Sequence, residues 1–309
     1  MTANTATRTA RVDVYDRVTS HIVAALEQGT RPWMQPWNAS HVAGSISRPL
    51  RHNGKPYSGV NIICLWMTAE VSGFSCPYWM TFQQAKELGG FVKKGEHGSP
   101  VVYASTFTKK EQTDNGQESE AEIPFLKSYT VFNASQVEGL PQHFYQLAEP
   151  NTNTLERIER AEEFFKNTQA DIRTGGDRAF YSPAEDYIRL PPFETFRDAE
   201  SHAATLAHEL THWTRHASRL NRDFGQKRFG DDAYAVEELV AELGSAFLCA
   251  DLQLTPEVRE DHASYLACWL KVLKQDKRAI FTAASHASKA VDFLHGLQPG
   301  ASDQPSDES

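Results

Sequence analysis

The sequence predicts an α+β protein, with a mixed N-terminal domain followed by a mainly helical C-terminal domain that carries a small sheet. The first observation is the length of 309 residues, which suits about two domains that each bury a core. The second is a content of 40% hydrophobic and 23% charged residues, which is typical of a folded globular protein. The third is that strand patterns occupy a few short stretches, whereas apolar residues recur at helical spacing over much of the rest.

The first domain is expected to cover residues 12–147, after a small and polar stretch at 1–11 that we expect to be flexible. Apolar residues recur at helical spacing from Val14, and this helix should end near Gly29. The further elements, in chain order, are a buried helix over 60–71, a short helix over 81–88, and paired strands over 100–107 and 125–132. The polar and acidic residues 109–122 between the strands predict an exposed hairpin loop.

The second domain is expected to cover residues 155–296, after a linker at 148–154 (AEPNTNT). Its predicted elements, in chain order, are a helix over 155–168, a hairpin of two short strands over 179–190, one long helix over 196–218, and helices over 232–252, 264–274 and 279–294. The small and polar residues 297–309 predict a disordered tail.

An HExxH motif within the long helix predicts a metal site. Residues four apart lie on one helical face, so the imidazoles of His208 and His212 can reach one cation. Glu209 stands beside the first of them and is the candidate general base, which would take a proton from a water activated by the metal. Two histidines leave a tetrahedral zinc site incomplete, so a third ligand must come from elsewhere in the chain.

Two acids on a downstream helix are the candidates for that third ligand. Glu238 and Glu242 lie four residues apart and share a face, so one can bind the metal while the other contacts a ligand histidine. The pattern resembles the acidic helix of zincins with a glutamate ligand, in which the first acid binds the metal. That resemblance favours Glu238 as the ligand and Glu242 as the outer partner, with the reverse order left open. The expected ion is Zn²⁺ or another divalent transition metal.

The N-terminal part is basic and rich in aromatic residues, although the whole chain has a formal net charge of −9. Residues 1–110 carry 12 basic and 6 acidic side chains, whereas residues 111–309 carry 19 and 34. Aromatic rings beside cations are what binding of single-stranded nucleic acid requires, although most such rings fill a core. The candidate DNA contacts are Trp33, Trp37, Arg51, Lys55, Tyr57, Asn61, Trp79, Lys93 and Lys94.

Several motifs in a specific order resemble one known family. In the N-terminal part they are PW…PW at 32–37, GKPYSGVN at 54–61, WMTFQQA at 79–85, KKGE at 93–96 and YTVFNASQVEGL at 129–140. In the C-terminal part they are HELTHW at 208–213 and EELVAELGSAFL at 237–248. From about residue 12 to residue 295, the chain is similar to the ArdC family of plasmid antirestriction proteins.

The resemblance implies a single-stranded-DNA-binding domain joined to a zincin-like metallopeptidase domain. Such proteins shield incoming plasmid DNA from host restriction during conjugation, so the implied partners are single-stranded DNA and a protein substrate such as a restriction-enzyme subunit. An alternative is protection by DNA binding alone, with a structural or inactive metal site. Metal-dependent cleavage of nucleic acid is a third hypothesis, which is disfavoured because such sites usually gather more carboxylates.

The compartment expected from the sequence is the cytoplasm of a bacterial recipient cell. The chain has neither an apolar signal segment nor a run of about eighteen apolar residues, so no membrane partner is expected. The four cysteines form no CxxC pair, which favours buried thiols in a reducing compartment.

Overall fold

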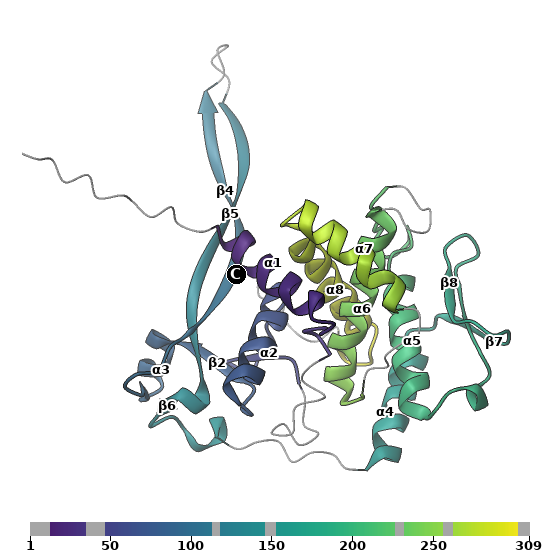
Figure 1. Ribbon diagram of the computed structural model, residues 1–309, viewed down its shortest axis with the longest axis horizontal. Helices are drawn as coiled ribbons and strands as arrows, with labels where there is room; N and C mark the ends of the chain where they lie inside the picture. The colour runs from purple at the N-terminus through teal and green to yellow at the C-terminus, as the bar shows by residue number, and fades with distance from the viewer. Residues whose placement is uncertain are drawn as a thin grey trace, which may run out of the picture.

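The computed structural model describes residues 13–34, 47–112, 118–145, 153–225, 232–255 and 262–301 (Figure 1). The helices are α1 Val14–Glu27, α2 Val60–Ser72, α3 Phe82–Glu87, α4 Thr154–Asn167, α5 Ala199–Trp213, α6 Asp232–Leu252, α7 His262–Gln275 and α8 Ala279–Gly296. The strands are β1 Leu50–Arg51, β2 Tyr78–Thr81, β3 Phe91–Val92, β4 Ser99–Gln112, β5 Glu118–Asn133, β6 Val137–Glu138, β7 Asp171–Thr174, β8 Phe180–Ser182 and β9 Tyr187–Leu190. The predicted α+β class is confirmed.

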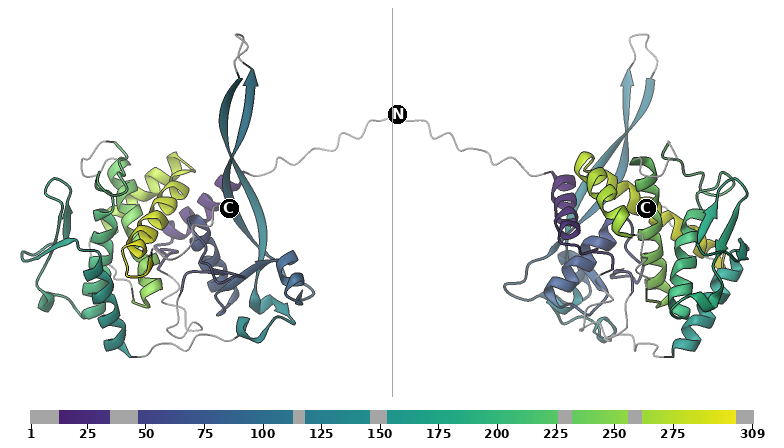
Figure 2. Two further views of the ribbon diagram at one scale, coloured as in Figure 1. Left: turned by 180° about the vertical axis from the view of Figure 1, so that it is seen from behind. Right: turned by 45° about the vertical axis from the view of Figure 1, so that its right-hand side comes forward.

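A long antiparallel ribbon dominates the N-terminal part. Strands β4 and β5 pair from Ser99 opposite Val131 to Gln112 opposite Glu118, and the far end of the ribbon projects away from the body of the molecule (Figures 1 and 2). The rest of this sheet has the order β1-β2-β5-β4. The predicted loop over 109–122 is wrong, because both strands continue into it. A projecting two-stranded ribbon needs no apolar face, so hydrophobic patterning does not reveal its polar part.

The C-terminal part packs helices around α6. In two views, the sheet β7-β9-β8 and the β4–β5 ribbon lie on opposite sides of α6 and α8 (Figures 1 and 2). The predicted hairpin over 179–190 is confirmed, but sequence reasoning missed β7, whose four residues are all exposed and so show no burial pattern. The helix predicted over 196–218 is shorter at both ends, because it begins after the capping residue Asp198 and ends at Trp213.

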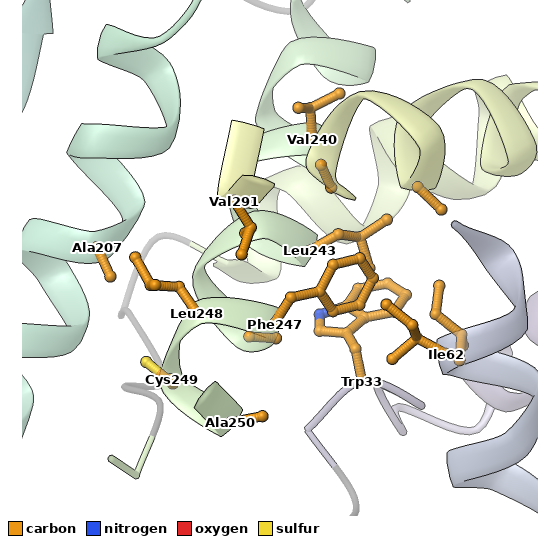
Figure 3. Close-up of a cluster of buried hydrophobic side chains, with 14 of the residues drawn as sticks. Trp33, Ile62, Ala207, Val240, Leu243, Phe247, Leu248, Cys249, Ala250 and Val291 are labelled. Atoms are coloured by element: carbon orange, nitrogen blue, oxygen red, sulfur yellow. The ribbon is translucent and has the colours of Figure 1, made fainter. Parts of the chain in front are cut away.

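The two parts of the chain share one hydrophobic core rather than two separate ones. Trp33 has no exposed surface and lies beside Phe247 of α6 and Ile62 of α2 (Figure 3). Its ring also meets Trp269 of α7 edge-on, with centroids 5.8 Å apart. A smaller cluster around Met80 belongs to the N-terminal part alone. The shared core therefore holds the segment around Trp33 against α6.

The ends of the chain and the linker are only partly described. Residues 1–12 and 302–309 lie outside the described residues, as do residues 148–152 of the predicted linker at 148–154, whose last two residues cap and begin α4. The first residues of the predicted tail are docked, because the amide of Gln298 donates to the carbonyl of Phe164 at 3.2 Å. Among the described helices, none has both the length and the apolar content that crossing a membrane requires.

Candidate metal centre

Helix α5 presents the HExxH residues toward α6. The side chain of Asp198 accepts a hydrogen bond from the amide of Ser201 at 2.7 Å and so begins the helix. The two helices approach closely where Gly244 faces Thr211, since a Cβ at Gly244 would lie 2.5 Å from Cγ2 of Thr211. This close approach brings the acids of α6 within reach of the histidines of α5.

The ligand atoms of His208, His212 and Glu238 converge on one point. One ligand atom from each residue lies within 4.8 Å of the others. Nε2 of His208 is 3.7 Å from Oε2 of Glu238, and Nε2 of His212 is 3.5 Å from Oε1 of the same carboxylate. Nε2 of His208 is buried and has no hydrogen-bond partner among the residues that the structure describes, which is costly unless a ligand occupies the site. These donors fit a divalent cation held by two imidazoles and one carboxylate.

The carboxylate of Glu237, which sequence reasoning missed, contacts His212 at Nδ1. Nδ1 of His212 lies 3.0 Å from Oε1 of Glu237, and Arg222 donates to both oxygens of that carboxylate at 2.8 Å. Burial raises the pKa of Glu237, but the hydrogen bonds from Arg222 and His212 lower it to about 2. Neighbours on a helix lie about 100° apart, so Glu237 and Glu238 meet different nitrogens of one ring. No sequence pattern marks Arg222, which comes from the segment after α5.

Glu242 lies behind the other histidine. Its Oε1 accepts hydrogen bonds from Nη1 of Arg31 at 3.2 Å and from Nε1 of Trp33 at 3.5 Å. Its Oε2 lies 3.8 Å from Nδ1 of His208, on the opposite side of that ring from Glu238. This geometry favours the order in which Glu238 is the ligand and Glu242 the outer partner, an assignment that stays a prediction.

The site is built to hold positive charge. Burial lowers the pKa of His212, but the negative charges of Glu238 and Glu237 raise it to about 10. Burial raises the pKa of Glu238, but the charge of His212 and the nearby His208 hold it well below its usual range. A bound cation and the proton on His212 compete for one nitrogen, so metal binding would release that proton.

Two further side chains complete the surroundings. Glu209, the candidate general base, is buried within α5. Tyr234, at the start of α6, was not singled out from the sequence. Its hydroxyl lies 3.1 Å from that of Tyr265, and burial together with the charge of Glu238 raises its pKa.

The candidate DNA contacts fall into two groups, of which the first is buried. Trp33 and Trp79 lie in the core, and Tyr57 is nearly covered. No base can stack on these rings without unpacking the core. The side-chain amide of Asn61 exchanges two hydrogen bonds of 2.8 Å with the main chain of Val102, which gives it a role in joining α2 to β4.

The second group consists of basic residues at the surface. Arg51, Lys55 and Lys94 are exposed, whereas Nζ of the half-buried Lys93 donates to the carbonyl of Ser135 at 2.9 Å. Trp37 lies outside the described residues.

Exposed aromatic rings occur at other positions in the same part of the chain. Four of them form what we call the aromatic set: Phe82 (58% exposed), Phe91 (59%), Tyr103 (44%) and Tyr129 (43%). The rings of Tyr103 and Tyr129 meet edge-on across the β4–β5 ribbon, with centroids 6.3 Å apart. Lys127 is the cross-strand partner of Tyr103. Composition drew attention to the aromatic residues of this part of the chain, but it could not tell which of their rings are exposed.

Comparison with known proteins covers nearly the whole chain. Residues 159–286 match a family described as zincin-like metallopeptidase, and residues 12–132 match the N-terminal domain of anti-restriction factor ArdC. An uncharacterized Sinorhizobium fredii protein, y4eC, is 42% identical over 94% of both chains. DNA primase TraC of Escherichia coli is 37% identical over 91% of this chain, which spans only 27% of TraC.

Two solved structures that resemble the chain are those of an antirestriction protein, ArdC from plasmid R388. The metal-free structure is 45% identical with a TM-score of 0.77, and the match covers 92% of this chain and 97% of that one. The Mn(II)-bound structure is 43% identical with a TM-score of 0.76, and the match covers 93% and 99%.

Proposed function

The chain belongs to the ArdC family of antirestriction proteins, which has a zincin-like domain, and from this we propose how it protects DNA. It binds incoming plasmid DNA while that DNA is single-stranded during conjugation, and it carries a zinc metallopeptidase-type site that acts on a protein such as a restriction-enzyme subunit. The observation that carries the proposal is the convergence of His208, His212 and Glu238 around a buried nitrogen to which no described residue offers a hydrogen bond.

Each residue of the centre has a part in peptide hydrolysis. His208, His212 and Glu238 would hold the ion, which when bound supplies Lewis-acid activation of water and of the scissile carbonyl. Glu209 accepts the proton of the attacking water and passes it to the leaving amine. Glu237 accepts a hydrogen bond from Nδ1 of His212 and so directs Nε2 toward the ion.

The choice of zinc follows from the donor set. Two imidazoles and one carboxylate, with a position left for water, are the ligands of many catalytic zinc sites. The R388 relative binds Mn(II), so other divalent transition ions are expected to enter the same site. The amount of metal bound per purified chain, measured separately after exposure to Zn²⁺ and to Mn²⁺, shows which of the two ions fills the site more completely.

The exposed aromatic set supports the DNA-binding part of the proposal. Rings with a free face stack on unpaired bases, and neighbouring cations pair with phosphates. Tyr103 and Tyr129 adjoin Lys127 on the ribbon. A flexible single strand lying along this ribbon would meet both kinds of group.

The alternative is protection by DNA binding alone, with a structural or inactive metal site. Burial of the centre favours it, because His208, Glu209 and Glu238 are all nearly inaccessible to solvent and so to a peptide. Glu209→Gln separates the two hypotheses, since it removes the base while leaving the ligands in place. The readout is transfer of an unmodified plasmid into a restricting recipient, and Glu194→Gln at an exposed site is the control.

If proteolysis protects, Glu209→Gln should lower plasmid transfer to the level seen without the protein, while single-stranded DNA binding is retained. Unchanged transfer with Glu209→Gln would show that hydrolysis is not the mechanism and would favour the DNA-binding alternative.

A further inference from the structure

Both histidines of the centre have a carboxylate beside Nδ1, at 3.0 Å for His212 and at the longer distance of 3.8 Å for His208. The groups that hold the two carboxylates come from different parts of the chain. His212 faces Glu237, which Arg222 holds; Arg222 follows α5 by a few residues. His208 faces Glu242, which Arg31 holds from a position 211 residues away in the sequence. The second support therefore crosses from the N-terminal part to the metallopeptidase helices.

We propose that Arg31 is a positioning residue of the metal centre, so that the N-terminal part completes the site through Glu242 and sets its affinity for divalent metal. The inference rests on the proposed metal site and deepens it. It assigns a role in metal binding to a residue that lies outside the matched metallopeptidase region of 159–286.

The first step of the argument is orientation of the carboxylate. Arg31 and Trp33 both donate to Oε1 of Glu242, which leaves Oε2 directed at Nδ1 of His208. At 3.8 Å the contact is longer than a hydrogen bond, so Glu242 acts on His208 through its negative charge, which favours the tautomer that carries its proton on Nδ1. The lone pair of Nε2 is then available to the ion. Without Arg31, the Glu242 carboxylate would lose its cationic partner and a restraint on its rotation.

The second step is that the position of Arg31 is held by the core. Trp33, two residues along, is wholly buried beside Phe247 and Leu243 of α6 (Figure 3). The amide of Met34 donates to the carbonyl of Arg31 at 2.9 Å, which closes a turn around this anchor. The guanidinium is therefore presented to Glu242 by a segment that is packed on the same helix.

The third step is that the pair is largely removed from solvent. The side chains of Arg31 and Glu242 are 16% and 6% exposed, so water screens their attraction only weakly. Loss of an outer partner of a metal ligand commonly weakens metal binding 10- to 100-fold. Because Arg31 acts through Glu242, we expect an effect near the lower end of that range.

The test measures metal affinity of the full-length protein, with Zn²⁺ in competition with a chromophoric chelator. Arg31→Gln should weaken binding about tenfold. Arg31→Lys should restore most of the affinity, because a single donor at 3.2 Å and a positive charge are what the contact requires. Thermal unfolding of the metal-free variants tests whether the change is confined to the metal site.

Arg48→Gln is the matched control. Arg48 also lies in the N-terminal part and donates to an acid of α6, Asp251, at 2.8 Å. That acid follows Glu242 by nine residues, about 13 Å along the helix. Arg48→Gln should therefore leave metal affinity within twofold of the wild type. Equal losses for Arg48→Gln and Arg31→Gln would overturn the inference, since both would then reflect general loosening of the contact between the two parts.

A double-mutant cycle with Glu242→Gln tests whether Arg31 affects metal binding through Glu242. If Arg31 acts through Glu242, Arg31→Gln should cost less than twofold in the Glu242→Gln background. A full tenfold loss in that background, or no loss in the single variant, would overturn the inference while leaving the proposed metal site intact. A wild-type chain that binds neither Zn²⁺ nor Mn²⁺ would overturn the proposed site and this inference together.

Discussion

The metal centre and the aromatic set use opposite physical means to prepare for a ligand. In the metal centre, buried charges are held by other buried charges, as in the contact of Arg222 with Glu237, whose side chains are 1% and 3% exposed. In the aromatic set, large uncharged rings such as Phe91 are exposed to solvent. A single substitution in the first region should therefore disturb several groups, whereas one in the second should remove a single contact.

The largest expected effect on metal binding is that of removing a ligand. His208→Ala should weaken Zn²⁺ binding by more than about 100-fold, which exceeds the cost of losing an outer partner. Binding of single-stranded DNA should stay unchanged, because the aromatic set lies on other elements. His216→Ala, which contacts Ser218 rather than the centre, is the control for metal affinity. A parallel loss of DNA binding in His208→Ala would show that the two regions are not separable.

The largest expected effect on stability is that of breaking the buried ion pair. Arg222→Gln leaves Glu237 buried without its cation, which typically costs about 3–5 kcal/mol of the free energy of unfolding. Arg173→Gln breaks an exposed pair with Asp171 and should change stability little. Urea unfolding of the metal-free proteins measures both. Similar small changes in the two variants would contradict the view that burial makes the centre sensitive.

Metal addition should stabilise the centre without any mutation. An ion that binds only the folded chain adds about 2.7 kcal/mol at a free concentration of 100 times its dissociation constant. The free energy of unfolding, measured with and without Zn²⁺, should rise by this amount in the wild type. It should not rise in His208→Ala at the same Zn²⁺ concentration; an equal rise there would place the stabilising ion elsewhere.

The smallest single effects are expected in the aromatic set. Tyr103→Ala and Tyr129→Ala should each weaken binding of single-stranded DNA by about 1–3 kcal/mol, the usual worth of one stacked base. Phe193→Ala removes a ring of similar exposure from the C-terminal part and should have no effect. Fluorescence anisotropy with a labelled oligonucleotide measures all three, and duplex DNA should bind less tightly because its bases are paired. Equal binding of Tyr103→Ala and wild type would remove the ribbon from the DNA site.

The salt dependence of DNA affinity separates the contribution of stacking from that of charge in the N-terminal part. Affinity for single strands should fall as salt rises, because phosphate contacts release counterions. Lys94→Ala should reduce the slope of that dependence, whereas Tyr129→Ala should lower affinity at every salt concentration with the slope unchanged. An affinity that does not respond to salt would contradict the role of the cations.

The sequence predicted some elements correctly and others incorrectly, and each outcome has a physical reason. The helix predicted over 232–252 agrees with α6 residue for residue, and it is a long run of good helix formers that is buried on nearly every side. The polar half of the β4–β5 ribbon was predicted as a loop, because a strand pair outside the core leaves no hydrophobic alternation. Strand β7 was missed because all four of its residues are exposed.

In the candidate sites too, the sequence predicted some features, whereas others depend on the fold. Composition drew attention to aromatic residues of the N-terminal part, but burial of Trp33 and Trp79 and exposure of Tyr103 depend on how distant segments pack. Charge patterning pointed to Glu238 and Glu242, yet it contained nothing about Glu237, whose importance comes from the ring nitrogen that it meets.

The sequence by itself determined that His208, Glu209 and His212 occupy adjoining turns of one helix, because helical geometry is a local property of the chain. Only the tertiary structure decided which carboxylate faces which nitrogen and that Arg31 reaches Glu242. Contacts between residues 211 positions apart depend on the packing of the whole core, and no local pattern of residues encodes that packing.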